Sequence, residues 1–151
     1  MRAINHALTG AIIGLSLPSP LLALPLALAS HFVCDAIPHY GGGKSTVSSK
    51  YFTIGLVVDA LLCILLVLLL GFSQPAHWLL ASSCAFLATA PDLLWIPGYI
   101  RVRNKKPFNL GKNWLMRFVS TIQWFERPIG AAVEFAWFIA ASSVLFAITV
   151  A

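Results

Sequence analysis

Charge is scarce in this chain, and negative charge is scarcest. Of 151 residues, five are Asp or Glu and ten are Lys or Arg, so 10% are charged, whereas 59% are hydrophobic. A soluble domain is charged at roughly a quarter of its residues because its surface faces water. A lipid-facing exterior needs no such charges. The composition therefore predicts an integral membrane protein and excludes an ordinary soluble domain.

Cysteine is scarce as well, and its placement excludes several kinds of site. Cys34, Cys63 and Cys84 each stand alone in an apolar stretch, and no Cys-x-x-Cys pair occurs. A thiolate zinc cluster, a dithiol redox motif and a disulfide framework all need paired or clustered cysteines. We therefore interpret the three cysteines as small buried residues.

Long apolar runs, by contrast, dominate the chain, and prolines separate them. Five of these runs are apolar enough to be membrane helices. They form a short N-terminal hairpin at residues 3–17 and 21–37, a long central hairpin at 51–72 and 76–96, and a C-terminal span at 128–150. Since no internal repeat and no second soluble domain is visible, residues 1–151 are predicted to form a single membrane domain.

One further helix is predicted to lie in the membrane interface rather than across it. Over residues 113–126, Trp114 and Phe118 fall on one helical face, and Arg117 and Glu126 fall on the other. An apolar face opposite a charged face is typical of an interfacial amphipathic helix. The expected fold is therefore all-α, with about five membrane helices and one interfacial helix.

All ten Lys and Arg residues fall on one side of this topology. With five segments that alternate in direction, the N-terminus, the 39–51 loop and the 97–128 region share that side. The positive-inside rule makes it cytoplasmic and leaves the C-terminus outside. The bases flank apolar runs rather than cover a soluble face, so we expect membrane lipids as partners, anionic ones included, and no nucleic acid.

The other ionisable residues also gather on this side. Near the cytoplasmic helix ends lie His6, His31, Asp35, His39, Asp59, Asp92, Glu126 and Glu134. An ionisable side chain at the centre of a span costs roughly 2.5 to 3.5 kcal/mol, so a convergent set predicts a functional site. The opposite side holds His77 and scattered Ser, Thr and Cys. This one-sided pattern argues against a conduit and favours a site at one face.

The densest part of this set has the spacing of a metal chelate. His31 and Asp35 are four residues apart, which places them on one face of a helix. Pro38 biases Ile37 out of the helical region and ends that helix, so His39 can fold back over its mouth. Two imidazoles and one carboxylate suit a divalent metal, zinc above all, and manganese or iron as well.

Three further residues are predicted to join this chelate. His6 shares a helix face with Gly10 and Gly14, and another helix can approach such a small-residue face closely. We therefore expect His6 to point into the bundle and to bind the metal. Asp59 is expected to complete the ligand set, and Asp92 is the candidate catalytic base.

Less specific roles remain open for several of these residues. A lone intramembrane His or Asp is often a hydrogen-bond partner between helices, and Asp59 and Asp92 are the stronger candidates for that role. Glu134 belongs either to the site or to an ion pair with an Arg at the interface. Glu126 fits a solvated pair with a neighbouring base. The metal-site prediction therefore depends mainly on the histidines and Asp35.

Three short motifs carry a resemblance to a known family. They are an early histidine in the first apolar segment, the segment Ser30-His31-x3-Asp35-x2-Pro38-His39, and Ala90-Pro91-Asp92 in the central hairpin. On these motifs the chain resembles small bacterial and archaeal inner-membrane proteins described as membrane-bound metal-dependent hydrolases, a group with a LexA-regulated member. The resemblance implies a hydrolase of the prokaryotic cytoplasmic membrane.

A weaker similarity links the chain to the zinc-dependent phospholipase C and nuclease superfamily. That superfamily also uses a His-x3-Asp pair followed by Pro and His. Here His39 follows Asp35 at a closer spacing, and no His-x3-Glu partner helix is present.

The expected function is therefore metal-dependent hydrolysis at the cytoplasmic membrane interface, on a phosphoester or lipid-linked substrate. The alternative is a non-enzymatic membrane protein, either a metal or proton transporter or a structural bundle with polar contacts between helices.

Overall fold

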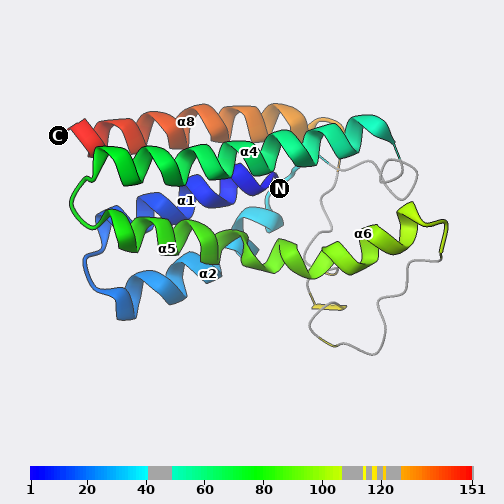
Figure 1. Cartoon of the computed structure of the whole chain (residues 1–151), viewed down its shortest axis with the longest axis horizontal. Helices are drawn as coiled ribbons and strands as arrows, with labels where there is room; N and C mark the ends of the chain where they lie inside the picture. The colour runs from blue at the N-terminus through cyan, green and yellow to red at the C-terminus, as the bar shows by residue number, and fades with distance from the viewer. Residues whose placement is uncertain (41–48, 107–113, 115–116, 119–120, 122–126, 151) are drawn as a thin grey trace.

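The structure is a computed structural model that describes residues 1–40, 49–106, 114, 117–118, 121 and 127–150. Its elements in chain order are α1 (Ala3–Ser16), α2 (Pro20–Ala36), α4 (Lys50–Ser73), α5 (Trp78–Thr89), the 3₁₀ helix η1 (Ala90–Trp95), α6 (Ile96–Arg103) and α8 (Gly130–Val150). Every one of these elements is helical, as the apolar runs predict. Figure 1 shows them lying along one common direction.

Three stretches of helix are long and apolar enough to cross a membrane. They are Lys50–Ser73, the continuous stretch Trp78–Arg103 formed by α5, η1 and α6, and Gly130–Val150. The apolar helices α1 and α2 are shorter, with 14 and 17 residues. A helix needs about 20 residues to cover the hydrocarbon of a bilayer.

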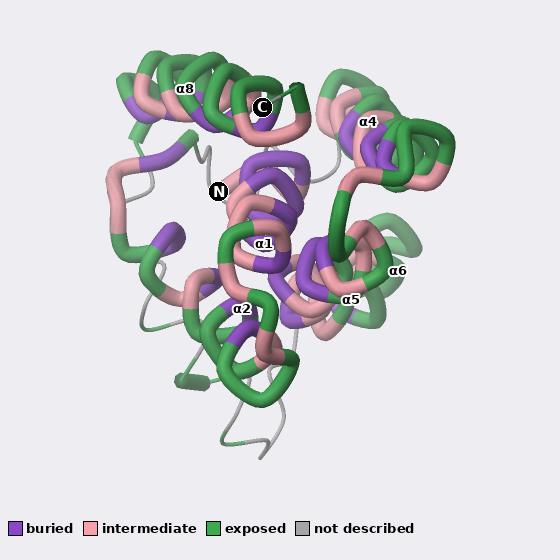
Figure 2. The backbone as a smooth tube through the Cα atoms, turned by 90° about the vertical axis from the view of Figure 1, so that its left-hand side faces the viewer, coloured by how far each residue is buried: buried purple, intermediate pink, exposed green. Residues whose placement is uncertain are grey.

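Helix α1 forms the centre of the bundle. It packs against α2, α4, α5 and α8, and the end view in Figure 2 shows it surrounded by these helices. Its closest neighbour is α5, because Gly10 and Gly14 bring the two backbones together. A Cβ on Gly10 would lie 2.4 Å from the carbonyl oxygen of Cys84, and one on Gly14 would lie 2.5 Å from the Cα of Ala81. The small-residue face predicted for this helix is therefore its contact with α5.

Replacing Gly10 by alanine is expected to destabilise the bundle by about 1 to 3 kcal/mol, since the added methyl would force two backbones apart. Gly71→Ala is the matched control, because a Cβ there meets only a side-chain atom of Trp78 at 3.8 Å. In the control, alanine should raise stability slightly through its better helix propensity. Thermal unfolding in detergent measures both changes, and a Gly10→Ala protein as stable as wild type would contradict this packing.

The observed helix bounds differ from the predicted ones mainly in the central hairpin. The helix predicted to end at residue 96 instead continues to Arg103. Pro97 does not break the helix because it lies in the first turn of α6, where its missing N–H is tolerated. Pro91 does coincide with a change in helix winding, because it lies at the start of the 3₁₀ helix η1, which begins at Ala90. The predicted interfacial helix at 113–126 lies almost entirely outside the described residues.

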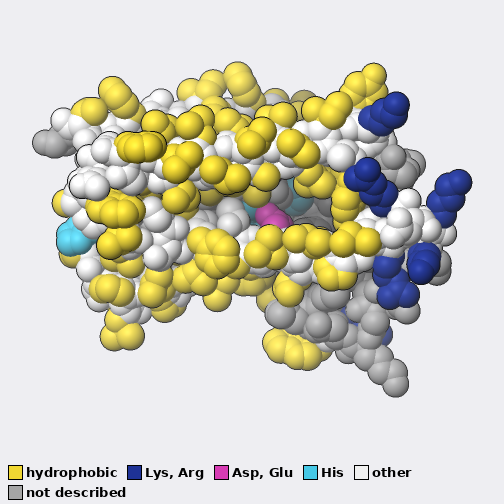
Figure 3. Space-filling model, in the orientation of Figure 1, with side chains coloured by type: hydrophobic (Ala, Val, Ile, Leu, Met, Phe, Trp, Pro, Cys, Tyr) yellow, Lys and Arg dark blue, Asp and Glu magenta, His cyan; other side chains and the backbone are white. Residues whose placement is uncertain are grey.

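Basic side chains gather at one end of the molecule. Figure 3 shows Lys and Arg clustered around α6 and the start of α4, and a histidine at the opposite end. The chain turn between α4 and α5, which contains His77, lies at the end away from α6. The described part of the bundle therefore has the one-sided distribution of positive charge that the sequence predicts.

Candidate metal centre

Four ionisable side chains converge around α1 from three different segments. His6 comes from α1, His31 and Asp35 come from α2, and Asp92 comes from η1. One ligating atom from each lies within 4.8 Å of the others, which is close enough for all four to surround one metal ion. His6 and His31 are fully buried, Asp35 is 1% exposed, and Asp92 is half-buried.

The orientation of His31 follows from a hydrogen bond to the main chain. Its Nδ1 lies 2.8 Å from the carbonyl oxygen of Ala88. Because a carbonyl can only accept, Nδ1 carries the proton, and Nε2 of the neutral ring presents a lone pair. Such a contact to a carbonyl commonly orients a metal-binding histidine.

The lone pair of His31 faces another acceptor. Its Nε2 lies 3.3 Å from Oδ2 of Asp35, without the geometry of a hydrogen bond. Two acceptors held this close require a proton or a metal cation between them or beside them. The His31–Asp35 pair is therefore a place where a cation is stabilised.

His6 lies against this pair with both ring nitrogens unsatisfied. Its Nε2 is 3.2 Å from Oδ1 of Asp35, and its ring stacks on that of His31 with 4.2 Å between the centroids. Neither nitrogen of His6 makes a hydrogen bond within the described part of the chain, although the side chain is fully buried. A buried imidazole without a hydrogen bond loses its interactions with water and gains none in return, unless it binds something else.

Asp35 also has a positively charged neighbour. The amino group of Met1 lies 2.5 Å from its Oδ1, and both groups are buried. The carboxylate thus holds the start of the chain beside the two histidines. No sequence pattern predicts this contact, because the contact depends on the path of the chain before α1.

Asp92 reaches the group because the long second stretch of helix changes its winding there. Pro91 lacks an N–H, and the segment from Ala90 is a 3₁₀ helix with Asp92 in its first turn. The side-chain direction therefore departs from that of a continuous α-helix. In the space-filling view, acidic and histidine side chains are visible at the bottom of a hollow between α4 and the α5–α6 stretch (Figure 3).

Asp59, predicted as a metal ligand, lies outside this group. Its Oδ2 accepts a hydrogen bond from the backbone N–H of Ala3 at 2.8 Å, and its Oδ1 accepts one from Ile4 at 3.0 Å. The first N–H groups of a helix have no partner within it, and a carboxylate there is favoured by the helix dipole. Asp59 therefore caps α1, which agrees with the helix-contact alternative.

His39, also predicted as a ligand, lies outside the group as well. Ile37 is extended, with φ −81° and ψ 147°, so the chain leaves α2 and does not fold back over it. The Nδ1 of His39 contacts the carbonyl of Ile37 at 2.9 Å, and its own carbonyl accepts a hydrogen bond from Arg127. Gly130 packs closely on the same backbone. His39 thus joins the end of α2 to the start of α8.

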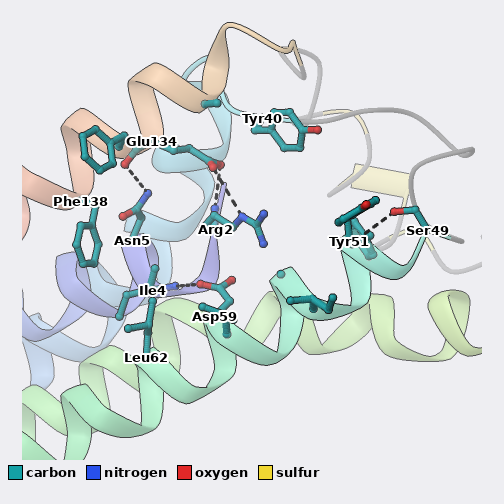
Figure 4. A pocket seen from close by; sticks show the side chains of 16 residues that line it. Arg2, Ile4, Asn5, Tyr40, Ser49, Tyr51, Asp59, Leu62, Glu134 and Phe138 are labelled. Atoms are coloured by element: carbon teal, nitrogen blue, oxygen red, sulfur yellow. Dashed lines mark hydrogen bonds and ion pairs between the residues drawn. The ribbon is translucent and has the colours of Figure 1, made fainter.

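Glu134 pairs with an Arg, which is one of the two roles that the sequence allows for it. The Oε1 of Glu134 accepts a hydrogen bond from the backbone N–H of Arg2 at 3.0 Å. Its Oε2 lies 4.0 Å from the side-chain Nε of Arg2. Figure 4 shows Glu134 and Arg2 facing each other at the start of α1. Glu126 lies outside the described residues.

The four converging residues are chemically suited to a divalent cation. Two imidazoles and carboxylate oxygens are ligands that zinc takes, and that manganese and iron also accept. Of the six residues predicted for the site, the structure brings His6, His31, Asp35 and Asp92 together and places His39 and Asp59 elsewhere.

In comparisons with protein-family models, curated proteins and solved structures, no match to this chain was found.

Proposed function

We propose that this chain is a membrane-bound metal-dependent hydrolase that acts at the cytoplasmic face of the membrane. One observation carries the proposal: His6, His31, Asp35 and Asp92 converge within 4.8 Å in a bundle with very few ionisable residues. Buried polar groups in lipid-facing proteins are costly and mark functional sites. The unsatisfied nitrogens of His6 and His31 supply the lone pairs that a metal needs.

In this proposal, His6, His31 and Asp35 hold the metal. Catalytic zinc sites use three protein ligands, often two histidines and a carboxylate, and leave one position open. These three residues are the most buried of the group, whereas Asp92 is half-buried. A bound zinc ion would supply Lewis-acid activation of water and of a phosphoryl oxygen. Manganese or iron would suit the same ligands.

Asp92 acts as the general base. Its carboxylate accepts a proton from the water that attacks phosphorus, the P–O bond to the ester alcohol breaks, and the alcohol leaves with a proton from the solvent. Asp92 suits this role because it is the least buried of the four residues and lies within reach of the other three.

The substrate is proposed to be a phosphoester carried by, or close to, the membrane. Five helices would lie in the cytoplasmic membrane, α1 and α2 as the short hairpin, with the basic end facing the cytoplasm. That end attracts anionic head groups, because positive charge near a membrane surface favours them. Asp92 lies in η1, which is followed directly by α6, and the last turn of α6 carries Arg101 and Arg103.

Hydrolysis by the purified full chain, with and without metal, tests this function. We expect the protein in detergent to release p-nitrophenol from p-nitrophenyl phosphate esters when loaded with zinc or manganese. Treatment with a chelator should abolish the reaction, and added metal should restore it. Activity that is unaffected by complete metal removal would contradict the proposal.

The distances also suit a second, non-enzymatic function. His6 and His31 lie 3.2 and 3.3 Å from Asp35, as in a buried ion-pair network that joins α1 to α2. In that case the group would serve the bundle alone, and the purified protein would bind no metal stoichiometrically. The metal content of the protein separates the two functions.

A further inference from the structure

A groove opens between α4 and α8, on the side of α1 away from α2. Its volume is about 890 Å³, and its floor is the start of α1, including Ile4 and Asn5. Ligand sites usually enclose roughly 300 to 1,000 Å³. The end view shows α4 and α8 standing apart above α1 (Figure 2). Both helices pack on α1 and hardly on each other.

The walls of the groove are hydrophobic along most of its length. Val58 and Leu62 line it from α4, and Phe135 and Phe138 line it from α8. Both helices are among those long enough to cross a membrane. Inside a bilayer no water is present to fill such a space. A hydrocarbon chain from the surrounding lipid is therefore the occupant that these walls fit.

One end of the groove is polar, and Arg2 dominates it. Figure 4 shows its guanidinium group between the walls, on the side of Tyr51 and Ser49. The side chain is 39% exposed, and Nε lies 4.0 Å from Glu134. The two terminal nitrogens make no hydrogen bond within the described residues, so they are available to an anionic group. A guanidinium group suits a phosphate because its N–H groups match the oxygens in a fork.

Two carboxylates also line this end, but other groups hold them. Asp59 accepts hydrogen bonds from the backbone N–H groups of Ala3 and Ile4. Glu134 accepts one from the backbone of Arg2. Positive charge extends beyond them, because the Lys and Arg side chains cluster at this end of the bundle (Figure 3).

A glycine makes room for the guanidinium group. A Cβ on Gly55 would lie 2.7 Å from one terminal nitrogen of Arg2 and 3.0 Å from the other. The absence of a side chain at this position on α4 therefore lets Arg2 lie across the polar end of the groove.

We infer that this groove binds one anionic glycerophospholipid from the bilayer, with an acyl chain between α4 and α8 and its phosphate on Arg2. The inference rests on the membrane insertion proposed above and not on the metal. The groove lies on the side of α1 opposite α2, which provides two of the four metal-site residues. It is therefore a second site, with its own ligand chemistry.

Lipid retention measured by native mass spectrometry tests the inference. The full chain is reconstituted in vesicles of phosphatidylcholine and phosphatidylglycerol in equal amounts and is then extracted in a mild detergent. We expect wild type to retain one phosphatidylglycerol in preference to phosphatidylcholine. Val58→Trp fills the groove with a side chain and should lower the retained fraction at least about tenfold, which corresponds to about 1.4 kcal/mol. Arg2→Gln should remove the preference for phosphatidylglycerol.

Two matched controls exclude general effects of these changes. Val57→Trp places the same side chain on an exposed position of α4 outside the groove, and Arg101→Gln removes a base from α6. Both should retain lipid as wild type does. Equal retention of the two lipids by wild type, or unchanged retention by Val58→Trp, would overturn the inference. Zinc content measured on the same samples should be unaffected by Val58→Trp. The lipid-binding inference and the metal-site proposal are therefore tested independently of each other.

Discussion

Replacing His6 by glutamine is expected to lower the affinity for zinc at least about a hundredfold, since even a residue that only orients a ligand changes affinity by about 10- to 100-fold. This substitution is expected to remove a metal ligand with little other change to the structure. Neither ring nitrogen of His6 makes a hydrogen bond within the described residues, so the change breaks none. Glutamine also fills much of the same volume. The fold should therefore persist while the metal is lost.

The matched control for this experiment is His39→Gln. His39 is also a buried histidine, with 3% of its surface exposed, and its backbone packs against the start of α8. Its ring contacts the carbonyl of Ile37 and lies outside the converging group. Zinc titration monitored by calorimetry should give wild-type affinity for His39→Gln. If both substitutions weaken binding equally, or if neither does, the ligand assignment is wrong.

Replacing Asp92 by asparagine is expected to lower kcat about 10²- to 10⁴-fold, the usual contribution of a general base. The amide keeps the size of the side chain but cannot accept the proton. Zinc should remain bound, because His6, His31 and Asp35 still provide three ligands. Steady-state kinetics and elemental analysis of the same preparation measure the two effects together.

Asp59→Asn provides the control for Asp92→Asn. It removes the same charge from a carboxylate that caps α1 instead of joining the converging group. We expect its kcat to match wild type at temperatures where the variant is folded. An Asp92→Asn protein with wild-type kcat would exclude Asp92 as the base, and one that loses its zinc would make Asp92 a ligand instead.

Helix periodicity was sufficient to predict the core of the candidate site. The spacing of His31 and Asp35 places both on one face of α2, and both side chains lie in the converging set. The face shared by His6, Gly10 and Gly14 correctly predicts a closely packed helix contact, here with α5. Both features depend on local helix geometry, which the sequence determines directly.

The placement of Asp59 and His39 could not be derived in the same way. Depth along a helix axis says how far a residue lies from the membrane surface, but not which neighbour its side chain meets. Asp59 is at a plausible depth, yet it faces the N–H groups of Ala3 and Ile4. His39 follows a proline-induced turn whose direction depends on contacts with the start of α8. Both outcomes are set by tertiary packing.

The effect of a proline on the helical stretch Trp78–Arg103 also depends on its position. The helix predicted to end at residue 96 continues through Pro97, because in the first turn of α6 the proline ring fits the helical backbone. At Pro91, in contrast, the winding changes from α-helix to 3₁₀ helix, and Asp92 lies beside the residues from α1 and α2. A proline therefore contributed to the candidate site by changing the winding of the helix rather than by ending it.

The molar ratio of zinc to protein in the purified wild-type chain is the most direct test of the account. It is measured by elemental analysis after reconstitution with zinc and removal of loosely bound ions by gel filtration. The convergence of His6, His31, Asp35 and Asp92 predicts stoichiometric zinc in wild type, and little in His6→Gln. If the wild-type protein retains no zinc, and no manganese or iron after the same treatment, the group is a polar contact between helices and the hydrolase proposal fails.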